Sequence, residues 1–130
     1  MKKRLNNEKG QSMVEFALIM PILLLIIVGI IEFGFMFSSF LTLTNASREA
    51  VRALSLGSTD ASATQRAKDS SMNLDPTQLV VIINPSGSTR SPGDSVTVTI
   101  TYEYDFLTPF MEKLFGSNFQ LKTDTTMRVE

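Results

Sequence analysis

The chain has 130 residues and a net charge of −1, enough for one small domain plus one membrane segment, and this charge gives no reason to expect a nucleic-acid partner. It contains no cysteine and no histidine, which excludes disulfides, thiol nucleophiles and the commonest general base and transition-metal ligand. We therefore expect no catalytic residue, no metal site and no cofactor, and an enzyme is the least favoured class of function.

Residues 1–10 form a basic leader. It carries one acid, Glu8, and four basic residues, which are Lys2, Lys3, Arg4 and Lys9. Positive residues next to a membrane span stay on the cytoplasmic side. The leader therefore predicts a single-pass protein of the cytoplasmic membrane, with the N-terminus inside and the C-terminal domain outside.

A long apolar run follows the leader, with no charged residue between Phe16 and Ile31. Continued through Glu32 to Phe37, the run would extend about 33 Å as a helix, and a bilayer core of about 30 Å needs no more. We predict a membrane span at about residues 16–37, with the lipid bilayer as its surroundings. Glu32 would then either contact a partner helix or mark the outer interface. A cleaved secretory signal is disfavoured because the bulky sequence "EFGFMF" follows the run.

The helix is expected to continue beyond the membrane, because "SSFLTLTNASREAVRALSLG" is rich in helix formers and lacks proline. Ala46, Ala50 and Ala53 recur at helical spacing and give a face of small residues. Gly57 is a typical helix stop. The sequence therefore predicts one helix over residues 11–57 whose outer third is amphipathic.

Residues 58–75 are polar and leave two alternatives open. They form either a short helix, with Asp60 as its N-cap, or a flexible linker.

Residues 76–130 read as a small antiparallel β domain. "QLVVIIN" is a β-branched run that ends at Asn84-Pro85, and residues 95–106 alternate strictly between apolar and polar, which is typical of a half-buried strand. Its apolar positions are Val96, Val98, Ile100, Tyr102, Tyr104 and Phe106. The last stretch, "FQLKTDTTMRVE", also alternates, with Phe119, Leu121, Met127 and Val129 expected to point inward.

A short helix is predicted between the last two strands, with Thr108 as N-cap, Pro109 in the first turn and Gly116 at the end. Its apolar face comprises Leu107, Phe110, Met111 and Leu114. The fold class is therefore α+β: a long transmembrane helix that extends into a small outer domain with about three antiparallel strands and short helices. The apolar sheet face is expected to pack on the outer part of the long helix or on a neighbouring subunit.

The N-terminal segment resembles a known family. The leader ends at Gly10, and Glu15 is the fifth residue after it, as in the class III signal of type IV pilin-like proteins. "KGQSMVEFALIMP", "EFGF" and "LTNASREAVRAL" are closer still to the TadE/TadG-like family of Flp (Tad) pilus assembly. One departure is Phe16, where cleaved members of the family often have tyrosine.

The resemblance implies a non-enzymatic minor pilin or pseudopilin. A prepilin peptidase would cut after Gly10, which makes Gln11 the mature N-terminus, so we assign Gly10 and Gln11 to processing. Glu15 and Glu32 are assigned to assembly. The implied partners are the peptidase, other pilin or pseudopilin subunits and the Tad inner-membrane assembly proteins, and the mature subunit would belong to the membrane or to an extracellular pilus.

Two alternatives remain open. The first is an uncleaved bitopic membrane protein whose outer domain binds a protein or cell-wall partner, and the second is a membrane-anchored enzyme. Glu15 likewise has two readings. Its carboxylate either pairs with the α-ammonium that cleavage would create at Gln11, here or on a neighbour, or lies among the headgroups without a role.

Overall fold

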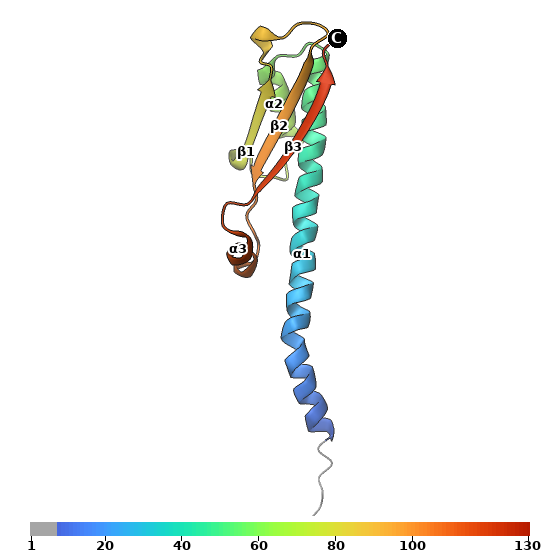
Figure 1. The fold of residues 1–130 in the computed structure, drawn as a ribbon, viewed down its shortest axis with the longest axis vertical. Helices are drawn as coiled ribbons and strands as arrows, with labels where there is room; N and C mark the ends of the chain where they lie inside the picture. The colour runs from blue at the N-terminus through green and yellow to red at the C-terminus, as the bar shows by residue number, and fades with distance from the viewer. Residues whose placement is uncertain (1–7) are drawn as a thin grey trace, which may run out of the picture.

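The computed structural model describes residues 8–130 and has the α+β architecture that the sequence predicts (Figure 1). A single long helix runs the length of the molecule, and the other elements lie beside the half that is nearer to its C-terminal end. The helices are α1 (Glu8–Ser55), α2 (Asp60–Asp69) and α3 (Pro109–Phe115), with one-turn 3-10 helices at Pro76–Gln78 and Gly87–Thr89. The strands are β1 (Leu79–Asn84), β2 (Ser95–Glu103) and β3 (Gln120–Arg128), antiparallel in the order β1-β2-β3.

Helix α1 is 48 residues long and begins at Glu8, before the expected start at residue 11. Pro21 lies within it and does not end it. The C-terminal end is closed by Gly57, which has a φ of +88°. The N–H of Ser58 donates to the carbonyl of Ala53, and that of Gly57 to Leu54, the pair of bonds that defines a Schellman motif. Gly57 is therefore the helix stop that the sequence indicates.

The small-residue face of α1 carries the sheet. Ala46, Ala50 and Ala53 are buried, and so are the larger Leu43 and Val51 on the same part of the helix. Small side chains let the strands lie close to the helix backbone, so the sheet packs on α1 of its own chain. The alternation in β2 is confirmed as well: Val96, Val98, Ile100 and Tyr102 are all buried.

Strand β3 departs from the expected pattern. Met127 was expected to point inward, but its side chain is 39% exposed. It lies opposite Val96 on an edge strand, where the core covers only part of the side chain. The buried contacts of β3 with α1 are instead partly polar: the Thr125 and Ser47 hydroxyls lie 2.6 Å apart.

The polar segment after α1 is helical from Asp60 to Asp69, which favours the helix over the linker. Asp60 is not its N-cap, however. The Thr59 hydroxyl accepts the N–H of Ser62 at 3.2 Å and occupies that role, so the Asp60 carboxylate is free to bind elsewhere. Ala63 and Ala67 bury the inner face of α2 against the core.

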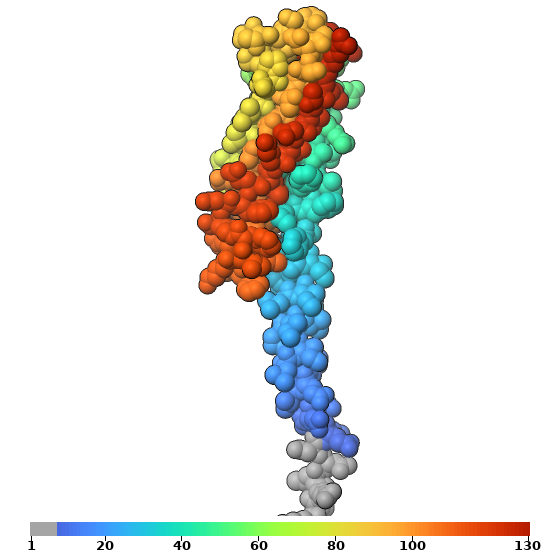
Figure 2. All heavy atoms as spheres, viewed as in Figure 1, coloured from blue at the N-terminus to red at the C-terminus, as the bar shows by residue number. Residues whose placement is uncertain are grey.

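Among the described residues, the N-terminal part of α1, residues 8–27, is exposed along its whole length (Figure 2). Within the described residues, α1 is the one helix long and apolar enough to cross a membrane, and none of its most apolar window is buried. The fold thus consists of an exposed apolar segment of α1, here called the apolar rod, and a small domain that packs on the C-terminal part of the same helix.

Candidate functional site

Three features could carry function: the N-terminal end of α1, the junction of α1 with α3, and a polar clip at the far tip of the domain. The described residues hold no group of three or more acidic side chains placed to bind a metal ion.

At the N-terminal end, Gly10 and Gln11 lie in the first turn of α1. The Gln11 side-chain amide donates to the Glu15 carboxylate at 3.2 Å, and both residues are exposed. The structure therefore brings together Gln11 and Glu15, two of the residues that the sequence singles out.

Glu32 lies in a different environment from Glu15. Its side chain is only 2% exposed and faces the segment that follows β2. The carboxylate accepts the Leu107 N–H at 2.9 Å, the Tyr104 hydroxyl at 3.3 Å and the Thr108 hydroxyl at 3.4 Å. Glu32 thus binds the residues that lead into α3, and its contacts lie within the chain.

These contacts explain why β2 is shorter than the alternation suggests. The strand ends at Glu103, and the chain from Tyr104 to Thr108 leaves the sheet to surround Glu32. Thr108 is the N-cap of α3 by its position, but its hydroxyl contacts Glu32 and makes no capping bond to the helix.

An aromatic cluster lies next to Glu32 and joins α1, the end of β2, α3 and the start of β3. The Phe106 ring stacks on Phe115 with centroids 5.7 Å apart and lies 5.5 Å from both Tyr104 and Phe119. Phe33 of α1 meets the edge of the Phe115 ring at 6.3 Å. Such pairs add to the stability that burial alone provides, so the cluster fixes α3 against α1.

The pKa of Tyr104 reflects its burial next to Glu32. Its burial, the negative charge of Glu32 and the hydrogen bond to that carboxylate raise the pKa of Tyr104 from 10.0 to about 12. The neutral phenol is therefore the form that the junction holds.

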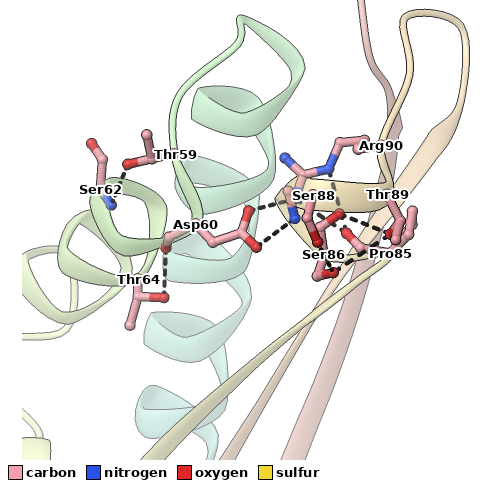
Figure 3. A network of polar contacts seen from close by, with 10 residues as sticks. Thr59, Asp60, Ser62, Thr64, Pro85, Ser86, Ser88, Thr89 and Arg90 are labelled. Carbon is pink, nitrogen blue, oxygen red and sulfur yellow. Dashed lines mark hydrogen bonds and ion pairs between the residues drawn. The ribbon is translucent and has the colours of Figure 1, made fainter.

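At the far tip, Asp60 clips α2 to the loop between β1 and β2 (Figure 3). Its carboxylate accepts the Gly87 N–H at 2.8 Å and forms an ion pair with Arg90, whose side chain is only 7% exposed. Arg90 also donates to the Pro85 carbonyl at 3.1 Å. Burial of Asp60, which alone would raise its pKa, is outweighed by these donors, so the pKa lies below 3.8.

The sequence alone does not reveal that Glu32 meets residues 104–108 or that Asp60 meets the loop between β1 and β2. The aromatic cluster had a signal, since "EFGFMF", "YEYDF" and "LFGSNF" are all rich in aromatic residues. No pattern in the sequence indicates the partners of Asp60, because Arg90 lies 30 residues further along the chain, in a polar loop.

Comparison with known proteins gives one match. No curated protein and no solved structure matches the chain. A family model described as TadE-like protein matches residues 10–52, which include the apolar rod and most of the helix beneath the sheet. Together with the candidate membrane helix, this match fits a membrane-anchored component associated with the Tad pilus. The resemblance seen in the sequence is therefore confirmed: the segment from Gly10 to Arg52 is similar to the TadE-like family.

Proposed function

We propose that the protein is a minor pilin or pseudopilin-like subunit of a Tad pilus or secretion apparatus, inserted with its domain outside the cytoplasmic membrane and cut after Gly10 by a prepilin peptidase. The observation that carries the proposal is the arrangement of Gly10, Gln11 and Glu15 at the entrance to a bare apolar helix within the TadE-like segment. The protein acts by assembly through this helix and is a substrate of the peptidase.

The geometry at the N-terminus suits this role. Cleavage would create an α-ammonium at Gln11, one helical turn from the Glu15 carboxylate that the Gln11 side chain already contacts. At the membrane edge such a pair is worth only about 1 kcal/mol, because water and headgroups screen it. Its contribution would be registry, since it holds neighbouring helices at one axial offset.

Processing is tested by the mass of the native protein in cells with and without a prepilin peptidase. Gly10→Leu should keep the full-length mass, because the peptidase must approach the backbone closely at that residue. Gly34→Leu is the matched control: a Cβ added at Gly34 meets no atom within 4 Å and the residue lies far from the cleavage point, so this variant should be cut normally. Normal cleavage of Gly10→Leu contradicts the proposed processing, and an uncut wild-type chain favours the bitopic membrane protein.

Assembly is tested at Glu15, with piliation measured by electron microscopy and by the yield of sheared fibres. Glu15→Leu should reach the membrane and abolish assembly, and Glu15→Gln, which keeps the shape and loses the charge, should impair it strongly. Glu8→Leu is the control, because this exposed glutamate belongs to the leader that cleavage removes. Normal piliation in Glu15→Leu cells would rule out the pairing and leave Glu15 as a bystander at the headgroups.

Orientation has its own test. The basic leader predicts that protease added to intact spheroplasts digests the domain beyond residue 57. Complete protection until lysis would reverse the topology.

A further inference from the structure

Helix α3 exposes an apolar face that no other described residue covers. The side chains of Leu107, Phe110 and Leu114 are 63%, 53% and 64% exposed, although all three are large and hydrophobic. Phe110 and Leu114 are one helical turn apart and therefore share a side of the helix. Of the apolar face that the sequence predicts, only Met111 is buried.

The remaining sides of α3 differ in character. Met111 and Phe115 point toward α1: a Cβ added at Gly29 would lie 3.5 Å from the Met111 methyl group, and the Phe115 ring lies against Phe33. Glu112 and Lys113 are exposed and, at 100° per residue, lie on the part of the helix circumference that Phe110, Met111, Leu114 and Phe115 leave free. The helix is therefore amphipathic, with one apolar side bound to α1 and the neighbouring apolar side unoccupied.

The height of α3 along α1 places this free side within the bilayer. Gly29 lies about 21 Å beyond Glu15 along the helix axis, and Phe33 about 27 Å, at 1.5 Å per residue. The hydrocarbon core is about 30 Å thick. If Glu15 lies at one edge of this core, α3 lies within the last 10 Å or so of the opposite side, the depth at which interfacial amphipathic helices rest.

The same height accounts for the position of Glu32. It lies about 26 Å beyond Glu15, so without cover its carboxylate would face hydrocarbon, where an unpaired charge is costly. The segment from Tyr104 to Thr108 supplies three hydrogen-bond donors to it. The carboxylate is thus shielded at the depth where shielding is needed.

We propose that α3 is an interfacial membrane helix that rests in the leaflet remote from the N-terminus, with Leu107, Phe110 and Leu114 among the lipid acyl chains and Glu112 and Lys113 at the headgroups. The occupant of the free face is lipid because this face lies at the same depth along α1 as the end of the exposed apolar segment of that helix, beside Gly29. The chain therefore has two membrane contacts, the spanning helix α1 and the short interfacial helix α3 beside it. This proposal rests on membrane anchoring and not on a role in the pilus.

Tryptophan fluorescence tests the proposal directly, since the chain contains no tryptophan. The full chain, with Phe110→Trp or Leu114→Trp, is reconstituted in phosphatidylcholine vesicles whose acyl chains carry bromine at a shallow or a deep position. Both sites are more than half exposed, so the larger ring has room. We expect blue-shifted emission that shallow bromine quenches more strongly than deep bromine.

Three further variants serve as controls. Leu25→Trp, within the span, should be quenched most by deep bromine, and Ile82→Trp, exposed on the sheet, should emit as in water without quenching. Lys113→Trp, on the polar side of α3, should be quenched less than Phe110→Trp. Emission from both α3 variants that matches Ile82→Trp would overturn the proposal. Blue-shifted emission that no bromolipid quenches would also overturn it, because protein from a second copy would then cover the face.

Discussion

Replacing Glu32 by leucine should release α3 from α1 while the sheet stays folded. The three donors that Glu32 accepts all belong to residues 104–108. The two hydroxyls can rotate toward other acceptors, but the backbone N–H of Leu107 cannot. This N–H is partly buried, and a donor left without a partner in such a site costs about 1–3 kcal/mol. Taking about 2 kcal/mol, the amides of residues 104–115 should exchange hydrogen about thirty times faster than in the parent chain.

Hydrogen–deuterium exchange in nanodiscs measures this effect segment by segment. Glu32→Gln retains one accepting oxygen and loses the charge, so it should raise exchange about fivefold, which corresponds to about 1 kcal/mol. Glu49→Leu is the matched control, because this glutamate is exposed on the same helix. Burying a carboxylate also carries a desolvation cost that leucine removes. Unchanged or slower exchange in Glu32→Leu would show that this cost outweighs the hydrogen bonds, and would refute the reasoning.

Three further predictions concern the domain. Tyr104 has a raised pKa, so its contribution to stability is complete below pH 10 and is lost as the pH rises through about 12. The absorbance of the phenolate should show one tyrosine that ionises only at this higher pH, and Tyr104→Phe should remove that step. Arg90→Ala removes the ion pair that joins the Asp60 carboxylate to the loop. It should lower the free energy of unfolding by about 1–3 kcal/mol in a detergent denaturation series. No change would mean that this ion pair does not stabilise the fold. Ala50→Leu should cost about 1–3 kcal/mol by overpacking the helix–sheet interface, whereas Arg48→Leu on the exposed side should not; equal stability of the two would contradict the close approach of sheet and helix.

The elements that depend on local pattern were predictable from the sequence. The alternation in β2 and the alanine spacing in α1 both state which side of an element is apolar, and both sides are buried as expected. The role of Gly57 as the helix stop was predictable too, because a positive φ at a helix end favours glycine. The role of a residue can be predicted from the sequence wherever its near neighbours along the chain determine that role.

The contacts of Glu32 could not be predicted in this way, because its three partners lie 72 to 76 residues away. From the sequence, Glu32 was an isolated acid in an apolar run, and only the fold shows which groups meet it. Asp60 illustrates the opposite failure. Its position before a helix favours a capping role, but Thr59 takes that role and the fold supplies Arg90 as a partner.

The unbroken path of α1 has a mechanical consequence. The Ser55 carbonyl accepts the N–H of Glu130, so both ends of the domain are fixed to the last turn of the helix. Ser55 lies about 60 Å beyond Glu15 along the axis. A change of about 10° in the tilt of the membrane segment, well within the range that such helices show, would swing the far tip sideways by about 10 Å. The helix and its domain therefore move as one arm, so a small change in tilt within the membrane becomes a much larger sideways displacement at the tip of the domain.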